Sequence, residues 1–273
     1  MWIWRTDGRP PHDLFLPPHD PFLEVISHAI GRLKSLSITA SLKILPDITA
    51  QLSLPAPLLE SLSLCGGYRT RTLYNPALAT SLFNGDLSSL RVLHLQCVRT
   101  ELPRRNMVNL TSFTLCYTLT HEISIGQLLD FLESAPRLRH VELHDAPFIS
   151  GDQNGRLVSL ARLENLIIRA AEPPSLLLDH ILVPVGASLE TELKSPRPRI
   201  EDQLPRSLDN LRNLSNFTRL YLSIDESDSL IKIAGLNGRV RLVSTSPGAS
   251  IVDFVLESLS RFNTSTVEQL EIS

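Results

Sequence analysis

The chain has 273 residues, a formal net charge of −3 at pH 7 and a pI of about 6.2. This balance argues against the strongly basic surface of a nucleic-acid or membrane-surface binder. Leucine accounts for 51 residues, roughly twice ordinary usage, whereas aromatic residues make up only 5%. Leucine must therefore supply most of the hydrophobic core.

Residues 1–19 are expected to form an irregular N-terminal segment. They contain no apolar run after their charges, so they do not predict a secretory signal. The apolar stretch 175–185 is interrupted by polar residues and is too short to span a bilayer. Cys65, Cys97 and Cys116 form no C-x-x-C pair, which fits a reducing cytoplasmic or nuclear compartment.

From residue 33 onward the chain repeats the template L-x-x-L-x-L, with Phe, Val or Ile in place of some leucines. The eight matches are LKSLSI (33–38), LESLSL (59–64), LRVLHL (90–95), LTSFTL (110–115), LRHVEL (138–143), LENLII (163–168), FTRLYL (217–222) and VEQLEI (267–272). Successive starts lie 26, 31, 20, 28, 25, 54 and 50 residues apart. The two long intervals predict degenerate repeats near 187–193 and 238–244.

Alternation within the template places apolar side chains on one side of a short strand. One such strand cannot bury them alone, but stacked repeats form a parallel sheet whose inner face is covered by the returning segments. Apolar spacing predicts helical returns at 20–33, 75–87, 124–138 and 200–214. Ser124 is the expected cap and Pro136 the expected stop of the third, and Pro205 should kink or start the fourth.

The predicted fold is therefore α/β: a right-handed leucine-rich-repeat solenoid over residues 20–273, with about ten repeats. This horseshoe has one parallel concave sheet and a helical or irregular convex side. Partner binding is expected on the concave face, where Arg and aromatic residues are the strongest candidates. The predicted partner-binding residues are His94, Gln96, Thr114, His140, Glu142, His144, Asn165, Arg169, Arg219 and Tyr221.

The stretch LRHVELHD (138–145) carries two histidines and a glutamate, which raises the question of a metal site. On a strand, Val141 and Leu143 point inward and the three polar side chains point outward. His140 and His144 then lie about 13 Å apart at ~3.3 Å per residue, too far to share a zinc ion. A solvated or partner-facing polar ladder is the favoured interpretation, and no metal or cofactor is expected.

No catalytic motif stands out. The chain lacks the G-x-G-x-x-G, G-x-x-x-x-G-K-[ST] and G-x-S-x-G patterns. His94 and Cys97 could be considered a base and nucleophile, but three residues apart on a strand they face opposite sides. Cys65 and Cys116 are expected to be ordinary thiols on the concave face. The basic KSPRPR (194–199) and the acidic DESD (225–228) are expected to be solvated loops.

Three longer phrases carry a family resemblance: PAPLLESLSL (55–64), LFNGDLSSLRVLHLQCV (82–98) and LLDFLESAPRLRHVELHDA (128–146). They resemble the leucine-rich-repeat regions of fungal, basidiomycete-type F-box-like proteins. The resemblance implies the substrate-binding solenoid of a ubiquitin-ligase adaptor, and it carries over no catalytic residue.

The chain departs from that family at its start. Residues 16–30 look like the opening of an F-box, but the first repeat begins at Leu33 and leaves no room for a three-helix F-box. The chain alone is therefore not expected to bind the ligase linker subunit. The leading hypothesis is recognition of a protein partner or ubiquitination substrate. The alternatives are a repeat scaffold unrelated to ubiquitin and, less favoured, an enzyme.

Overall fold

The computed structural model describes part of the chain. The described residues are 25–26, 28–41, 45–52, 54–66, 83, 87–98, 102, 107–116, 123–145, 148–149, 155–170, 172–193, 200–212, 217–224, 229–235, 239–244, 260 and 268–272. For the strands between residues 217 and 244, the structure describes the backbone alone. Among the described residues, no helix is long and apolar enough to cross a membrane.

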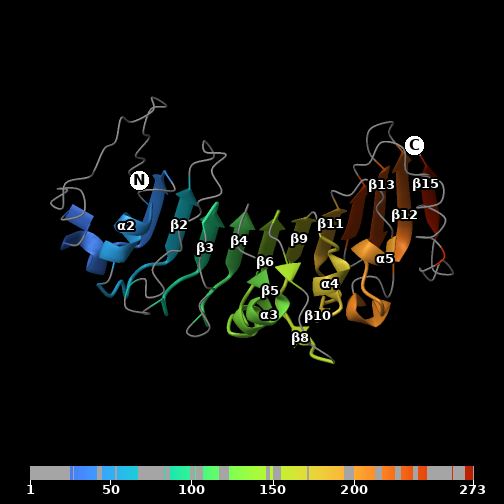
Figure 1. Cartoon of the computed structure of the whole chain (residues 1–273). Helices are drawn as coiled ribbons and strands as arrows, with labels where there is room; N and C mark the ends of the chain where they lie inside the picture. The colour runs from blue at the N-terminus through green and yellow to red at the C-terminus, as the bar shows by residue number, and fades with distance from the viewer. Residues whose placement is uncertain are drawn as a thin grey trace.

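An eleven-stranded sheet runs the length of the described chain, in the order β1-β2-β3-β4-β6-β9-β11-β14-β13-β12-β15. Figure 1 shows these strands side by side in one row, with α3, α4 and the short strands β5, β8 and β10 gathered along its lower edge. The large strands are β1 (Ser35–Ala40), β2 (Ser61–Gly66), β3 (Val92–Gln96), β4 (Ser112–Cys116), β6 (His140–His144), β9 (Asn165–Ala170), β11 (Ser188–Leu193), β12 (Phe217–Ile224), β13 (Ser229–Gly235), β14 (Arg239–Ser244) and β15 (Gln269–Ile272).

The first seven strands of this sheet order, from β1 through β6 and β9 to β11, are parallel and pair without a register shift. A tight turn precedes most of them: the amide of the first template leucine donates to the carbonyl three residues earlier. This bond recurs at Leu59–Ala56, Leu90–Leu87, Leu110–Met107, Leu138–Ala135 and Leu163–Leu160, at 2.9–3.1 Å. Because the same local turn starts each strand at the same template position, every strand enters the sheet in the same register.

The leucines of the template form the core, as the alternation predicts. Across adjacent strands, Leu93, Phe113, Val141 and Leu166 pair in register, and each is at most 4% exposed. A second buried row contains Leu64, Leu95, Leu115, Leu143 and Ile168. A single short strand could not bury its leucines alone. In the sheet, the leucines of each strand are covered by the neighbouring strands and by the connecting segments.

One connecting helix is well formed, and it matches the prediction for 124–138. Helix α3 (Ile125–Glu133) is capped by Ser124, whose hydroxyl accepts a hydrogen bond from the Gln127 amide at 3.1 Å. Its apolar side packs under the sheet, where the rings of Phe131 and Phe113 have centroids 4.5 Å apart. The helix ends three residues before Pro136, since its last turn closes at Ser134.

The other predicted helices agree less well with the structure. The return at 20–33 has helical residues at 25–26 and 28–29 and then η1 (Ile30–Arg32), whereas 75–87 lies mostly outside the described residues. The return predicted at 200–214, with Pro205 as its kink or start, is helical only in part. That segment holds a single turn, α5 (Ile200–Gln203), and η3 (Leu208–Asn210), separated by Pro205. Pro205 lacks an amide hydrogen and interrupts the helical bonds there.

Smaller elements complete the connecting side of the sheet. They are α2 (Leu45–Gln51), α4 (Ser175–Leu178), and the two-stranded pairs β5 (Ile123–Ser124) with β7 (Phe148–Ile149) and β8 (Val158–Ser159) with β10 (Ile181–Leu182). Among the described residues, the connecting side therefore combines short helices with two-residue strands.

The C-terminal strands correct the prediction of a wholly parallel sheet. The expected degenerate repeats do form strands, β11 and β14, but β14 pairs directly with β11. Strand β13 runs antiparallel to both β14 and β12, and β12 then pairs in parallel with β15. Strand β12 was expected next to β11, but in the sheet it lies three positions from β11, beyond β14 and β13.

Candidate functional site

The face of the sheet opposite the leucine rows carries three rows of mostly polar side chains from β1 to β11; it is called the open face below. The register assigns the first row Ser35, Ser61, Val92, Ser112, His140, Asn165 and Ser188. The middle row is Ser37, Ser63, His94, Thr114, Glu142, Ile167 and Glu190, and the last is Thr39, Cys65, Gln96, Cys116, His144, Arg169 and Glu192.

Strand β6, which contains the stretch HVELH, divides its side chains as predicted. Val141 and Leu143 are each 1% exposed, whereas the side chains of His140, Glu142 and His144 are 44%, 43% and 18% exposed. The strand period of two forces this division, because a slip of one residue would expose the apolar pair. The two histidines therefore belong to the open face but differ in burial.

His140 belongs to a small polar group on the first row. Its Nδ1 lies 2.9 Å from Nδ2 of Asn165, and its Nε2 lies 3.6 Å from Glu164 Oε2. The other carboxylate oxygen of Glu164 accepts a hydrogen bond from Arg139 at 3.0 Å. These side chains join β6 to β9 at the edge where the strands begin.

A charged cluster occupies the other end of the same strands. Arg169 donates to Glu190 at 2.8 Å, and its Nε lies 3.4 Å from Glu192 without hydrogen-bond geometry. Nε2 of His144 lies 3.6 Å from Glu142 Oε2. Burial lowers the pKa of His144, and the Arg169 charge lowers it further, while Glu142 acts in the opposite direction. One guanidinium thus sits among three carboxylates, and the cluster is acidic when His144 is neutral.

The structure also pairs two residues that the sequence analysis did not connect. Cys65 and His94 lie on adjacent strands β2 and β3, offset by two positions in register. The neighbouring His94 imidazole is the main cause that lowers the pKa of Cys65, against the effect of burial. Cys65 is in turn the main cause that raises the pKa of His94. The hydrogen bond that the geometry gives to His94 joins its Nε2 to Gln96 Oε1 at 3.5 Å.

The other two cysteines are buried. Cys97 follows β3 with a positive φ of 52° and is 3% exposed. Cys116 ends β4 and lies in the last row beside Gln96, but it is only 8% exposed, and burial raises its pKa to about 11. The register places Cys65 and Cys116 in the same outward row, as expected, although Cys116 is buried there.

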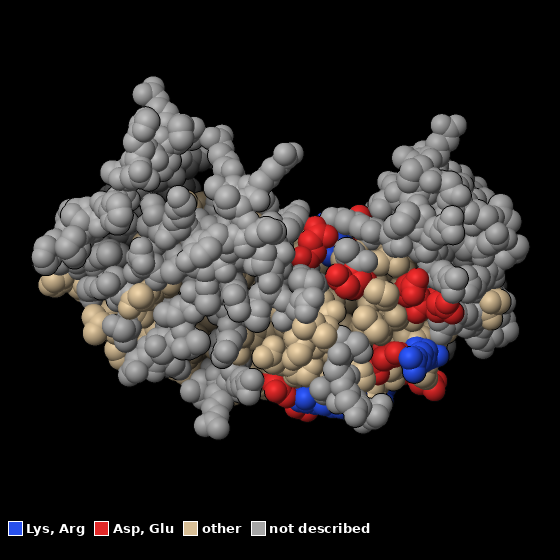
Figure 2. Space-filling model, in the orientation of Figure 1, with Lys and Arg blue, Asp and Glu red and all other residues tan. Residues whose placement is uncertain are grey.

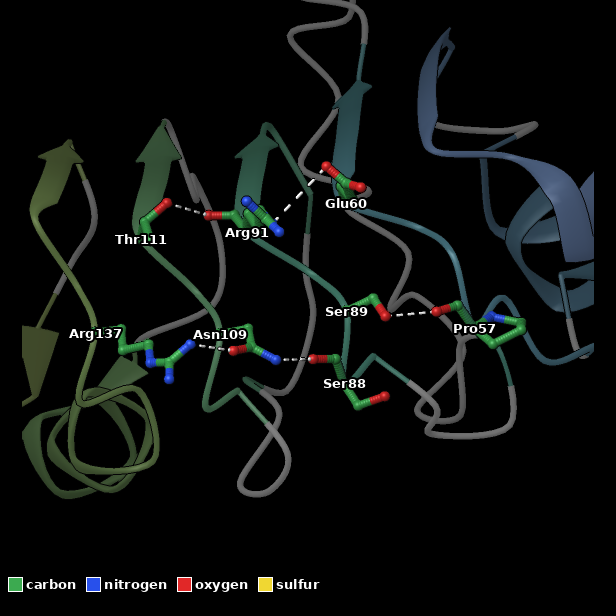
Figure 3. A network of polar contacts seen from close by, with 8 residues as sticks. All are labelled: Pro57, Glu60, Ser88, Ser89, Arg91, Asn109, Thr111 and Arg137. Atoms are coloured by element: carbon green, nitrogen blue, oxygen red, sulfur yellow. Dashed lines mark hydrogen bonds and ion pairs between the residues drawn. The ribbon is translucent and has the colours of Figure 1, made fainter.

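The edge where the strands begin is held by polar contacts between successive repeats, which Figure 3 shows. Thr111 Oγ1 donates to the Arg91 carbonyl at 3.0 Å, and Arg137 donates to Asn109 at 2.7 Å. Asn109 in turn donates to the Ser88 carbonyl at 2.8 Å, and Arg91 lies 3.8 Å from Glu60. These contacts link neighbouring repeats and leave the open face unaffected, so we assign them a structural role.

The connecting side carries charges of its own. Figure 2 shows that, on the face turned toward the viewer, the described charged side chains gather over the half of the molecule that carries α3, α4 and α5. Arg156 pairs there with Asp130 at 2.8 Å and with Glu133 at 2.7 Å. Because these contacts tie α3 to the following connection, they also serve the fold.

Eight of the ten predicted partner-binding residues share the open face of β3, β4, β6 and β9. The other two, Arg219 and Tyr221, belong to β12, and their side chains lie outside those that the structure describes. Sequence reasoning missed Glu190 and Glu192. Their signal was the alternation in SLETEL, but the register of that weak repeat was left open, so the outward positions could not be assigned.

The described residues include no group of three or more His, Cys, Asp or Glu that could hold a metal ion. His144 approaches Glu142, whereas His140 turns to Asn165 and Glu164. The open face offers hydrogen-bond donors, imidazoles and carboxylates over several strands, an arrangement suited to binding an extended or folded partner.

Comparisons with known proteins give no family. No protein-family model matches the chain, no curated protein matches it, and no solved structure matches it.

Proposed function

We propose that this chain is a leucine-rich-repeat solenoid that recognises a protein partner through its open face. In this proposal it is the substrate-binding part of an F-box-type ubiquitin-ligase adaptor, or a relative that lacks the F-box. The proposal gives the open face a binding role and no catalytic one.

The observation that carries the proposal is the combination of one repeated unit with three uninterrupted outward rows. Seven consecutive parallel strands share one register and bury the same template positions. The fold therefore presents side chains at regular intervals of about 4.8 Å across strands and about 6.6 Å along them. Stacked repeats with such surfaces commonly bind other proteins.

The chemistry of the rows changes along the sheet, which suggests a partner with more than one kind of group. Around β3 to β6 the face offers His94, Thr114 and His140, which favour hydrogen bonds and carboxylates. The same region carries one carboxylate, that of Glu142. Around β9 and β11 it offers Glu190 and Glu192 beside a single Arg169. Such a gradient would orient the partner along the solenoid, because opposite charges approach and like charges repel.

The test places a photo-cross-linking amino acid at Thr114 on the open face. Leu157, which is 47% exposed on the connecting side, is the control position. We expect a partner that cross-links at position 114 but not at 157. A lower level of ubiquitination of that partner in cells that lack this chain would support the ubiquitin role, whereas an unchanged level would keep the recognition role and remove the ubiquitin role.

Affinity then decides whether the face itself binds. The purified partner should bind the variant His140→Ala/His144→Ala about tenfold or more weakly than the wild type, the size expected when central contacts are removed. Arg162→Ala, an exposed residue in the turn before β9, is the matched control and should bind normally. Equal affinity for the double variant and the wild type would contradict the proposal.

A further inference from the structure

The open face continues past β11, over β14, β13 and β12, and its charge changes sign there. Strand β14 pairs with β11 so that Arg241 lies beside Glu190 in the middle row. Antiparallel pairing then places Lys232 of β13 opposite Arg241, and Tyr221 of β12 opposite Lys232. The middle row thus runs from Glu190 into two cations and an aromatic residue.

The first row carries two more cations. Arg239 of β14 lies beside Ser188 of β11. Ala234 of β13 lies opposite Arg239, and Arg219 of β12 lies opposite Ala234. The alternate positions are apolar and continue the leucine rows: Leu220, Leu222, Ile231, Ile233, Val240 and Leu242. The strand period of two therefore assigns the cations to the open face.

Four cations and one tyrosine form what is called the basic block below: Arg219, Lys232, Arg239, Arg241 and Tyr221. Among the paired positions of β12 to β15 there is one carboxylate, that of Glu271 in β15, which lies opposite Tyr221. The stretch from β6 to β11 is the reverse, since Arg169 stands there among three carboxylates. The open face therefore has an acidic part and a basic part.

One pairing within the block destabilises the free sheet. Lys232 and Arg241 lie directly opposite each other on antiparallel strands, where residues are about 4.5–5.5 Å apart and like charges are unfavourable. Glu190 lies beside Arg241 in the register, but it also binds Arg169 at 2.8 Å, so it balances only part of this charge. An anion bound between the two cations would remove the repulsion, so the pairing points to an anionic ligand.

We propose that the basic block docks a short acidic segment of the protein partner, with about two or three carboxylates over about four extended residues. The block spans three strands, about 10 Å at ~4.8 Å per strand, a length that such a segment covers at ~3.3 Å per residue. Arginine binds carboxylates through two parallel hydrogen bonds, and aromatic residues anchor interfaces. The inference rests on the proposed function for the existence of the partner, and it adds the chemistry of one docking segment.

The neighbouring part of the open face argues against a long polyanion such as RNA. Glu142, Glu190 and Glu192 lie on β6 and β11, beyond β14, and they repel negative charge. A nucleic acid that extends past β14 toward β11 would meet them, whereas a short acidic segment fits on the block alone. The net charge of −3 points the same way, since general polyanion binding uses an overall basic surface.

The first experiment measures binding of a labelled peptide with Glu-Asp-Glu-Asp at its centre to the full chain, by fluorescence anisotropy. The counterpart with Gln-Asn-Gln-Asn is the control peptide. We expect the acidic peptide to bind, to raise the melting temperature of the chain, and to lose affinity as salt is added, because exposed charges are screened. Equal binding of the two peptides would overturn the proposal.

The second experiment assigns the binding to the block. Lys232→Gln/Arg241→Gln removes the opposed pair and should bind the acidic peptide about tenfold or more weakly than the wild type. Lys34→Gln/Arg162→Gln, at two exposed positions outside the block, makes the same change in net charge and should bind like the wild type. Equal losses in both variants would mean that overall charge, and not the block, holds the peptide.

Stability separates docking from a structural role. Because the like charges oppose each other, Lys232→Gln should leave the melting temperature of the free chain unchanged or raise it. A lower melting temperature would mean that Lys232 serves the fold, against the proposal. If the double variant does not fold, Lys232→Gln alone must still weaken peptide binding, and unchanged binding would refute the block.

Two other occupants are outcomes of the same assay. A single-stranded RNA that binds more tightly than the acidic peptide would replace the proposal by nucleic-acid binding. The link between β12 and β13 carries the acidic DESD (225–228), and it joins β13 at Ser229, about 10 Å along the strand from Lys232. If the peptide binds only after this link is changed to NQSN, the chain's own loop is the occupant and the proposal is wrong.

The proposed function and the docking segment fail separately. The partner cross-linked at Thr114 should lose affinity for Lys232→Gln/Arg241→Gln as well as for His140→Ala/His144→Ala. Loss with the histidine variant alone would keep the partner and remove the basic block as its docking site. Peptide binding at the block without any cross-linked partner would keep the block and remove the proposed function.

Discussion

The sheet has two regions that are built differently. From β1 to β11 the strands follow chain order and are all parallel, and long stretches of chain separate each strand from the next. From β12 to β14 the chain forms a meander in which β13 is antiparallel to both neighbours. Only four residues, 225–228, separate β12 from β13, and only three, 236–238, separate β13 from β14. Parallel neighbours need about a dozen connecting residues, so such short links require antiparallel pairing.

The difference shows what the repeat template determines. It determines which residues form a strand and which of them face inward, but not which strand becomes the neighbour. FTRLYL (217–222) matches the template better than GRVRLVS (238–244), yet the latter contains β14, which pairs with β11. Connection length therefore decides adjacency where the template does not.

The largest expected effect tests this order of strands directly. In a chain whose three cysteines are replaced, Glu190→Cys with Arg241→Cys places two thiols at paired positions of β11 and β14. A short bismaleimide should cross-link this pair almost completely, because neighbouring strands lie about 4.8 Å apart.

The control pair is Glu190→Cys with Tyr221→Cys, in the same row but three strands apart, or about 14 Å. It should give little product. Efficient cross-linking of the control, with none of the first pair, would restore the chain-order arrangement and remove the contrast between the two regions.

The second prediction measures how strongly the parallel region depends on its leucines. Leu143→Ala should lower the free energy of unfolding by about 2–5 kcal/mol, because it leaves a cavity in a core position that is 1% exposed. Leu58→Ala, at a leucine that is 50% exposed, is the matched control and should cost far less. Denaturant unfolding gives both values. Hydrogen exchange should show faster opening of β4, β6 and β9 than of β12 to β14, and a uniform change would mean that the two regions unfold as one unit.

Much of the parallel region followed from sequence. The template predicted the burial of Leu93, Leu115 and Leu143. Side chains alternate between the two faces of a strand, and only one of the two alternating sets is apolar. The same logic placed eight of the ten proposed binding residues on one face. The capped helix α3 was predictable from Ser124 and its apolar spacing, since both signals are local.

The rest depended on contacts between distant residues. Cys65 and His94 come near each other only through the register of β2 and β3, whose paired residues are 31 positions apart, and no single repeat reveals that register. Strand β13 was missed although Asn237–Gly238 between two alternating apolar runs is a hairpin signal. The leucine-rich-repeat template has no place for such a hairpin, so it does not predict β13. The segment 200–214 is less helical than its apolar spacing predicts, because Pro205 separates two short helical turns instead of kinking one helix.

A smaller effect is expected from the cap of α3, which belongs to the parallel region alone. Ser124→Ala removes the side-chain acceptor of the Gln127 amide and should cost about 1 kcal/mol in the free energy of unfolding. Ser124→Asp keeps an acceptor and should restore most of it. The loss should appear in hydrogen exchange of 125–133 and not in β12 to β14. No difference between the Ala and Asp variants would mean that the cap contributes nothing.

The smallest effect concerns pH, and it again separates the two regions. Burial and the Arg169 charge lower the pKa of His144 in the folded chain, whereas the unfolded chain has the ordinary value of 6.5. The unfolded state therefore binds more protons in the window just below pH 6.5, so stability falls as the pH drops through that window toward the folded pKa. His144→Gln removes this pH-dependent contribution to stability, and the melting temperature of the wild type should fall more than that of the variant between about pH 7 and about pH 5.5.

His140→Gln, which removes the more exposed imidazole of the same strand, is the control. If hydrogen exchange at mildly acidic pH shows the wild type losing protection in β6 and β9 before β12 to β14, the acid-sensitive element lies in the parallel region. If His144→Gln and His140→Gln respond to pH alike, burial of His144 between Glu142 and Arg169 is not what makes the sheet sensitive to acid.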